Sequence, residues 1–403
     1  MKRIERPLYL SRLQVLRGTP DIKVITGVRR CGKSELLKSY MAFLRQSDPQ
    51  ANLIYIDLMD LANEALLEYH TLYQYITKRH RDGAANYVFV DEVQLCTGFE
   101  KAVNSLHSTG GYDIYLTGSN AFMLSSDLAT LFTGRYLELH VLPFSFAEYL
   151  SYYEATDLDE AFERYTMEGG MAGSYAYPDE RNRNGYLAGV FNTIITRDLR
   201  QKYSLPDDTV LLKTADYLLD NIGNLTSPNN ISTTLSSHQW KTNHVTIGNY
   251  IEYLCRAFLF YRVQRYDIKG KKYLNTIEKY YMVDAGFRFT RLGRRNMDYG
   301  RLYENMVALE LLRRGYQIYV GKLYQKEVDF VALDDKQKIY IQVSDDISAP
   351  STLERELAPL YAIRDAYPKV LIARTRHAAY DQEGIKIIDM ARWLAGKEAA
   401  MPL

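Results

Sequence analysis

The chain has 403 residues, of which 47% are hydrophobic and 25% are charged, and its formal net charge is +1. This length predicts two or three domains with well-buried cores, and the composition is that of an ordinary globular protein. The near-neutral charge gives no overall field that would attract nucleic acid. The sequence also has no apolar run long enough to predict a membrane span.

Cysteine usage and the first residues indicate the compartment. Cys31, Cys96 and Cys255 are scattered and odd in number, which favours reduced thiols. The start of the chain carries charges with no apolar stretch behind them, so we expect no signal peptide. We therefore predict a cytoplasmic protein.

A motif near the N-terminus predicts a phosphate-binding loop. Residues 27–34 read Gly-Val-Arg-Arg-Cys-Gly-Lys-Ser, which is the spacing G-x-x-x-x-G-K-[ST]. The glycines let the backbone approach a polyphosphate, Lys33 supplies a charge for its β- and γ-phosphates, and the Ser34 hydroxyl is a ligand for Mg²⁺. The candidate ATP-binding residues are Gly27, Val28, Arg29, Arg30, Cys31, Gly32, Lys33, Ser34 and Glu35.

The flanking sequence supports this interpretation. Residues 23–26 form a short β-branched run before the loop, and residues 35–44 form a helix-forming stretch after it. A bound anion would then lie at the N-terminus of a helix.

A second segment predicts the acids that such a site needs. The apolar run 87–90 ends in Asp91 and Glu92, as expected for a buried parallel strand that brings a carboxylate to one edge of the sheet. Asp91 is the candidate Mg²⁺ ligand, and Glu92 is the candidate base that orients and deprotonates the attacking water. Residues 52–57 are the expected intervening strand. Two acids after an apolar strand favour hydrolysis of ATP over kinase-type transfer.

A third strand is expected at residues 112–116. The small polar residues Ser119 and Asn120 follow it and are candidates to sense the γ-phosphate, with an ordinary Gly-Ser-Asn turn as the alternative. Arg135, before a strand at residues 137–142, is a candidate arginine finger. It could act in its own subunit or a neighbour's, and a solvated surface arginine is the alternative.

Taken together, residues 27–34, 90–93, 116–120 and 134–136 with the Pro-Phe-Ser-Phe run at 143–146 resemble one family. It is the prokaryotic AAA-type ATP-binding proteins with a C-terminal domain of unknown function. The resemblance covers essentially the whole chain. It implies ATP and Mg²⁺ as cofactors and an ASCE-type P-loop ATPase, followed by a winged-helix segment and a restriction-endonuclease-like domain.

The predicted fold class is α/β, with an N-terminal parallel sheet, an all-α or winged-helix region, and a C-terminal α/β domain that resembles a PD-(D/E)XK nuclease. The predicted domains are an ATPase at 1–150, a helical lid and linker at 151–205, a winged-helix-like domain at 206–295 and a nuclease-like domain at 296–403.

The middle of the chain predicts helices followed by a basic hairpin. We expect helices at 209–222 and 246–260, and a short helix that begins with Ser227 and Pro228 as N-cap and first-turn proline. Residues 262–326 contain 15 Lys and Arg against 6 Asp and Glu, an excess of nine positive charges. This basic region is a candidate surface for double-stranded DNA, with an internally neutralised face as the alternative.

The last module has the order of a nuclease core but not its full set of side chains. Glu304 and Asp329 stand where metal-binding carboxylates belong, whereas Gln342 and Ser344 stand where a second carboxylate and a lysine belong. Glu304, Asp329 and Gln342 are therefore a candidate second site, with Lys338 as a relocated lysine. We favour a fold kept as a binding scaffold over an active nuclease.

The sequence thus predicts a slow Mg²⁺-dependent ATPase that repositions its appended modules, with ATP and double-stranded DNA as partners and no membrane association. The oligomeric state is open. The alternatives are an ATP-gated, metal-dependent DNA nuclease and a nucleotide-dependent binding switch that does not hydrolyse ATP.

Overall fold

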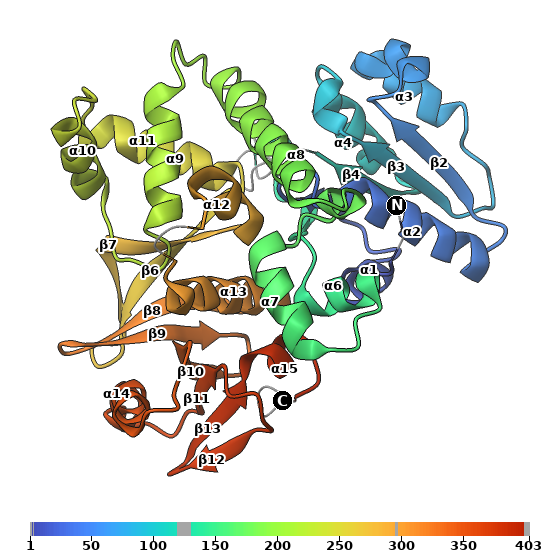
Figure 1. Cartoon of the computed structure of the whole chain (residues 1–403). Coiled ribbons are helices and arrows are strands. Elements are labelled where there is room, and N and C mark those ends of the chain that lie inside the picture. The colour runs from blue at the N-terminus through green and yellow to red at the C-terminus, as the bar shows by residue number, and fades with distance from the viewer. Residues whose placement is uncertain (1, 3, 119–129, 295–296, 399–403) are drawn as a thin grey trace. The chain divides into compact units, whose positions relative to one another are not determined.

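The computed structural model describes residues 2, 4–118, 130–294 and 297–398 (Figure 1). The chain divides into two compact units, Arg3–Val141 and Leu142–Leu403, the latter joined by Met1–Lys2. The predicted domain boundary at residue 150 lies beyond this division. The reason is that α6 (Phe146–Tyr153) packs Phe146 and Tyr149 into the core of the second unit.

The first unit is built on a sheet of five parallel strands in the order β2-β3-β4-β1-β5. The strands are β1 (Ile22–Thr26), β2 (Asn52–Asp57), β3 (Asn86–Asp91), β4 (Tyr112–Thr117) and β5 (Tyr136–His140). Their positions agree with the predicted strands to within two residues. Since β4 lies between β1 and β3, the phosphate loop after β1 and the acids after β3 flank the end of β4.

Helices cover both faces of this sheet. They are α1 (Pro7–Val15), α2 (Lys33–Ser47), α3 (Tyr69–Thr77) and α4 (Phe99–Thr109), with 3₁₀ turns η1 (Leu61–Leu67) and η2 (Val93–Leu95). Leu72 of α3 and Leu106 of α4 pack with Val88 on one face. On the other face the ring of Tyr40 of α2 meets Phe89 edge-on and Tyr115 at a tilt. This alternation along β3 and β4 is the period-two pattern of strands buried on both sides.

The second unit contains a mixed sheet of eight strands in the order β12-β13-β11-β10-β9-β8-β6-β7. The strands are β6 (Phe260–Asp267), β7 (Lys272–Met282), β8 (Gln317–Leu323), β9 (Lys326–Leu333), β10 (Lys338–Ser344), β11 (Lys369–Ala373), β12 (Tyr380–Gln382) and β13 (Ile385–Asp389).

The helices of the second unit are named here in chain order. They are α6, α7 (Leu158–Glu168), the 3₁₀ turn η3 (Ala172–Ala176), α8 (Glu180–Thr193), the π-helical segment η4 (Ile194–Arg200), α9 (Thr209–Asp220), α10 (Pro228–Ser237), α11 (His244–Arg256), α12 (Ala285–Leu292), α13 (Tyr299–Arg314), α14 (Pro350–Tyr361) and α15 (Met390–Leu394).

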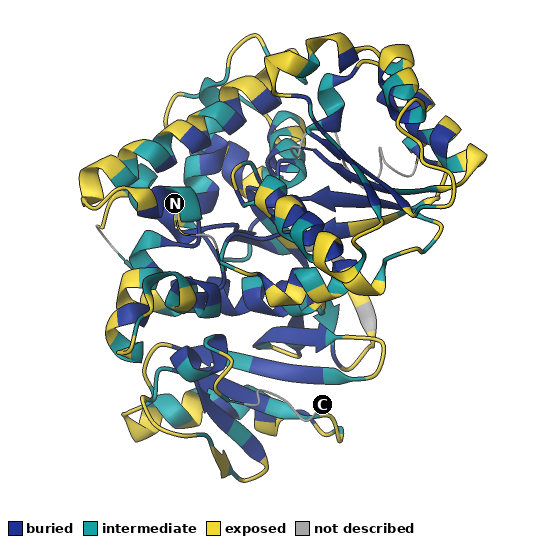
Figure 2. Ribbon diagram, turned by 90° about the vertical axis from the view of Figure 1, so that its right-hand side faces the viewer, coloured by how far each residue is buried: buried dark blue, intermediate teal, exposed yellow. Residues whose placement is uncertain are grey.

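The two faces of this sheet carry separate cores. Leu311 of α13 packs with Phe330 and Ile341 on one face, together with side chains of α6, α7 and α15. Leu357 and Leu360 of α14 pack on the opposite face. Figure 2 shows the strands buried and the outer faces of the helices exposed.

Local capping explains several helix boundaries. The Ser227 hydroxyl accepts from the backbone N–H of Asn230, and Pro228 opens α10, as predicted. Helix α11 ends at Arg256, and the predicted end at residue 260 was wrong. Phe258 adopts a positive φ of 54°, which a helix cannot continue through, and Phe260 begins strand β6.

The predicted basic hairpin is β6 and β7, which follow three helices in the predicted order. The hairpin does not stand apart as a free wing, because β6 pairs in parallel with β8. The 206–295 segment and the 296–403 segment therefore share one sheet and lie within one compact unit.

Candidate functional site

The phosphate loop adopts a conformation that its glycines permit. Gly27 has a φ of 144° and Gly32 a φ of 99°, both in the region that disfavours side chains. A Cβ on Gly27 would lie 2.2 Å from the carbonyl oxygen of Val141. The tight packing of this turn against the end of β5 thus requires glycine.

Lys33 begins α2 and is buried inside the loop. Its ammonium donates hydrogen bonds to the carbonyl oxygens of Gly27 at 2.9 Å and Val28 at 3.2 Å. These weak carbonyl partners are ones that phosphate oxygens can replace, because a charged acceptor makes a stronger bond to an ammonium. The first-turn backbone N–H groups of α2 lie directly after the loop and add a positive helix terminus.

The predicted Mg²⁺ ligands Ser34 and Asp91 influence one another, since the Ser34 hydroxyl favours the charged form of the buried Asp91 carboxylate and so opposes the rise in its pKa. The Thr117 hydroxyl donates to the same carboxylate, and Tyr55 donates to it at 3.3 Å. Burial raises the pKa of Asp91, and the bonds from Thr117 and Ser34 oppose that rise. A hydroxyl and a carboxylate side by side are oxygen donors of the kind that Mg²⁺ takes in nucleotide sites.

Glu92 lies at the turn that follows β3, half-buried and with a positive φ of 55°. Its backbone N–H donates to the Thr117 hydroxyl at 3.0 Å, and its carboxylate accepts a hydrogen bond from the Gln94 amide. Thr117 therefore holds both acids. The sequence interpretation did not predict Thr117, Tyr55 or Gln94 as partners of these acids, although the sheet order places the end of β4 beside Asp91.

Three other predicted residues remain. Ser119 and Asn120 lie outside the described residues. Arg135 is exposed on the turn before β5, where its carbonyl oxygen accepts from Ile22 at 3.0 Å.

A polar group on β5 that was not predicted lies beside the phosphate loop. The Thr26 hydroxyl is 2.6 Å from a carboxylate oxygen of Glu138 and 3.1 Å from Nδ1 of His140. Burial and the charge of Lys33 lower the pKa of His140 to about 4. At neutral pH the imidazole next to Lys33 is therefore uncharged.

The candidate second site brings Glu304 and Asp329 together, but around a lysine from another strand. Lys279 of β7 is buried, and its Nζ lies 2.8 Å from Glu304, 2.8 Å from Glu327 and 3.8 Å from Asp329. The sequence interpretation did not single out Lys279, because it lies before residue 296, where the predicted nuclease-like domain was expected to begin.

Gln342 and Lys338, the other two residues considered for the second site, make different contacts. Gln342 accepts from the Asp329 backbone N–H at 3.3 Å and donates to Glu356 at 3.2 Å. Lys338, the predicted relocated lysine, instead pairs with Asp365 at 3.3 Å. Among the residues that the structure describes, no group of three or more acids, histidines or cysteines is arranged to hold a metal ion.

Ion pairs take up much of the positive charge of region 262–326. Among the described residues, eight of its fifteen basic side chains pair with acids: Arg262, Lys279, Arg288, Arg291, Arg294, Arg301, Arg313 and Arg314. Lys269 and Lys271, on the exposed turn between β6 and β7, are separate from these pairs. About half of the basic side chains in this region are thus paired with acids of the chain.

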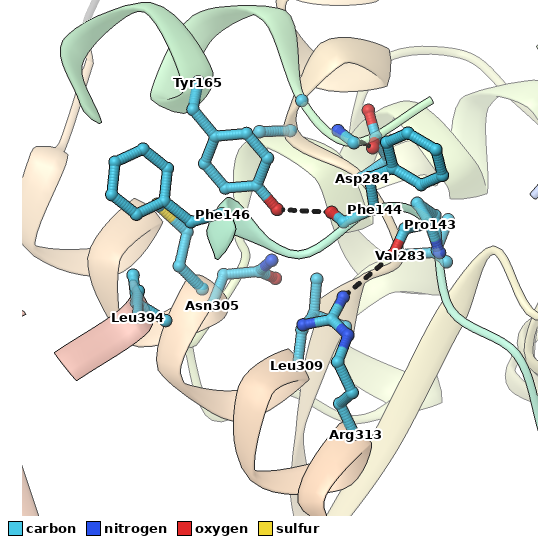
Figure 3. Close-up of a pocket in the computed structure, with 14 residues that line it drawn as sticks. Pro143, Phe144, Phe146, Tyr165, Val283, Asp284, Asn305, Leu309, Arg313 and Leu394 are labelled. Atoms are coloured by element: carbon cyan, nitrogen blue, oxygen red, sulfur yellow. Dashed lines mark hydrogen bonds between the residues drawn. The ribbon is translucent and has the colours of Figure 1, made fainter. Parts of the chain in front are cut away.

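A small cavity in the second unit is lined by the segment after β5 and by α13 (Figure 3). Tyr165 donates to the carbonyl of Phe144 at 2.7 Å, and Arg313 donates to that of Pro143 at 2.9 Å. The cavity volume of about 20 Å³ has room for a single water molecule. It is too small for a substrate or cofactor.

A broader depression of about 530 Å³ is lined by Thr196, Arg197, Arg200, Gln201 and Leu205. Arg200 there donates to the carbonyl oxygens of Leu205 and Pro206, so its guanidinium holds the chain after η4 in place.

In the described part of the chain, no helix is both long and apolar enough to cross a membrane.

Comparison with known proteins agrees with the loop geometry. Residues 19–150 match the family model of the AAA domain, and residues 159–298 match a domain of unknown function, DUF8612. The first unit therefore has an AAA-type P-loop ATPase fold. The family model supports nucleotide binding and ATPase activity in general terms.

Solved structures similar to this chain include the Aeropyrum pernix ORC1 protein in complex with DNA, at 12% identity and a TM-score of 0.30, covering 78% of this chain and 94% of that one. Another is domain III of the Thermotoga maritima replication initiation protein DnaA, at 18% identity and a TM-score of 0.27, covering 36% of this chain and 64% of that one.

Two relatives match along most of the chain. An uncharacterized protein of Methanocaldococcus jannaschii is 28% identical over 385 residues, which are 91% of this chain and 84% of that protein. An uncharacterized protein of Haemophilus influenzae is 36% identical over 397 residues, which are 97% of this chain and 98% of that protein. With its AAA domain at residues 19–150, the chain therefore belongs to the family of the Haemophilus influenzae protein.

Proposed function

We propose that this protein binds ATP with Mg²⁺ at the phosphate loop, hydrolyses it slowly and uses the nucleotide state to reposition its second unit. The observation that carries the proposal is the loop itself, in which Gly27 and Gly32 take glycine-favouring backbone angles around the buried ammonium of Lys33. Ser34 follows Lys33 at the start of α2, and its hydroxyl opposes the rise in the pKa of Asp91, at the end of β3.

Each residue has a defined task in this proposal. Lys33 exchanges its carbonyl partners for the β- and γ-phosphates, and Ser34 and Asp91 hold Mg²⁺. The bound ion would neutralise charge on the phosphates. Glu92 orients the attacking water and takes its proton. Ser119 and Asn120 are proposed to sense the γ-phosphate.

Arg135 is proposed as an arginine finger that stabilises charge in the transition state. Its exposure on the turn before β5 is compatible with action on a neighbouring subunit. A hydrolysis rate per protein that rises with protein concentration, and no longer does so in Arg135→Ala, would support action between subunits.

The proposed nucleotide site is tested by titrating the full chain with a fluorescent ATP analogue. Lys33→Ala should weaken binding by about 10- to 100-fold, because a charged donor to phosphate is lost. Lys38→Ala is the matched control, since Lys38 pairs with Glu35 on the exposed side of the same helix. Equal binding by Lys33→Ala and the wild type would contradict the site. Tight binding by the wild type without turnover would support the non-hydrolysing switch.

DNA is the proposed partner of the second unit, supported by the exposed lysines Lys269 and Lys271 at the tip of the hairpin. Two point charges on a turn suit phosphate contacts. The steady-state rate of ATP hydrolysis, measured with and without double- and single-stranded DNA, tests this. Stimulation by DNA that falls in Lys269→Glu/Lys271→Glu and with rising salt would support it. An unchanged rate in every case would count against DNA.

A further inference from the structure

The carboxylate cluster of the C-terminal sheet is organised around a lysine. Glu304 comes from α13, Glu327 and Asp329 come from β9, and Lys279 comes from β7. Lys279, Glu304 and Asp329 are each less than a tenth exposed. The ammonium lies within hydrogen-bond distance of Glu304 and Glu327 at once. A buried charge in this position needs compensation, since taking an isolated ion out of water costs several kcal/mol.

Two further polar groups donate hydrogen bonds to the carboxylates of this cluster. The Tyr281 hydroxyl donates to Glu304 at 2.6 Å, and the Val343 backbone N–H donates to Asp329 at 2.8 Å. Three acids and one lysine nevertheless leave an excess of negative charge. The formal sum is two negative charges, which the hydrogen bonds from Tyr281 and Val343 help to stabilise.

We propose that Lys279 is the resident counter-cation of this cluster, that it occupies the place of a divalent metal ion, and that the nuclease-like module works without metal as a scaffold. A metal ion would need carboxylate oxygens at about 2.0 to 2.6 Å around a common centre. The Lys279 ammonium already stands between two of the three carboxylates. It therefore excludes an ion from the space that those oxygens share.

The protonation of the cluster supports this assignment. Burial and the nearby charge of Glu304 raise the pKa of Asp329 well above its ordinary value. Burial lowers the pKa of Lys279, but the charges of Glu304, Asp329 and Glu327 outweigh it, so the pKa is raised.

The ion pairs of Lys279 connect the β6–β7 hairpin to the C-terminal segment of the chain. Lys279 lies on β7, which among the described strands pairs with β6 alone, apart from an isolated bridge between Glu278 and Thr226. Its ion pairs to α13 and β9 fasten the hairpin across the sheet to the module that follows. This inference is independent of the nucleotide site, since the cluster and the phosphate loop belong to different units.

The proposal is tested by titrating the full chain, without nucleotide, with Mn²⁺ and following the free ion by electron paramagnetic resonance. Wild type and Glu304→Gln should bind Mn²⁺ equally, because the cluster takes no metal. Lys279→Met should gain about one additional bound ion, because three carboxylates then face an open centre. Lys279→Met/Asp329→Asn should lose that ion again.

Thermal unfolding supplies the second readout. Lys279→Met should lower the unfolding midpoint by roughly 10 °C, because it leaves buried acids uncompensated, and millimolar Mn²⁺ should restore part of the loss. Lys326→Met is the matched control, since Lys326 is an exposed lysine at the start of β9. Its midpoint should change little in either condition.

Two results would overturn the proposal. One is a loss of Mn²⁺ binding in Glu304→Gln relative to the wild type, which would make the cluster a metal site as it stands. The other is a Lys279→Met protein that unfolds at the wild-type temperature. Should Lys279→Met fail to fold, the comparison of wild type with Glu304→Gln still decides, because it needs only the intact lysine.

Discussion

The Thr117 hydroxyl donates to the carboxylate of Asp91 and at the same time accepts the backbone N–H of the next residue, Glu92. One side chain at the end of β4 thus fixes the candidate metal ligand and the candidate base. In the proposed reaction Thr117 would act through these two acids, as a positioning residue.

Removing the Thr117 hydroxyl should slow ATP hydrolysis more than it weakens nucleotide binding. For Thr117→Val we expect the rate of hydrolysis at saturating ATP to fall by about 10- to 100-fold. This is the typical loss when a residue that hydrogen-bonds and orients a metal ligand is removed. Thr109→Val, on the exposed end of α4, is the matched control. The two quantities to compare are kcat and the dissociation constant of the fluorescent ATP analogue. An equal loss in both would point to a structural defect instead.

Glu92→Gln should retain nucleotide binding and lose turnover. A positioned base contributes about 10²- to 10⁴-fold, and an amide cannot take the proton of the attacking water. Single-turnover hydrolysis of radiolabelled ATP measures the chemical step directly. Glu64→Gln, on the exposed turn η1, should hydrolyse ATP at the wild-type rate. Hydrolysis by Glu92→Gln at the unaltered rate would show that the base is another group.

The neutral His140 predicts a pH dependence of stability in the first unit. Its folded-state pKa of about 4 lies below the ordinary value of 6.5, so between these values the unfolded chain binds the extra proton. Stability should therefore fall as the pH drops from about 6.5 to 4, and the contribution is complete above that range. Carboxylates titrate in the same interval, so the wild type is compared with His140→Gln. As the pH falls, the urea concentration at the unfolding midpoint should decrease less steeply for the variant than for the wild type. An equal decrease in both proteins would contradict the lowered pKa of His140.

Asp284 should prove essential to the stability of the second unit. Its buried carboxylate accepts the backbone N–H of Gly170 at 2.6 Å and that of Gly286 at 2.9 Å, which caps α12. Asp284→Ala leaves these two buried N–H groups without an acceptor. It should lower the free energy of unfolding by about 2 to 4 kcal/mol, measured by chemical denaturation. Asp334→Ala, in an exposed turn, should cost far less. A loss no larger than that of Asp334→Ala would mean that water replaces the carboxylate.

Much of the first unit followed from local patterns. The loop 27–34 and the acids Asp91 and Glu92 were predicted from short runs of sequence, and the described strands agree with the predicted ones. The same holds for Ser227 and Pro228 at the start of α10. These features depend on residues close together in the chain, where backbone preferences and hydrophobic periodicity act directly.

The partners of these residues were decided by the tertiary structure. Thr117 reaches Asp91 because β4 is inserted between β1 and β3, and no spacing in the sequence encodes that order. In the second unit, Lys279 rather than Lys338 faces Glu304, because β6 and β7 join the C-terminal sheet. The sequence by itself determined which elements form and which residue types their ends carry. Only folding decided which charges meet, because buried charges must find partners and the order of strands determines which ones lie within reach.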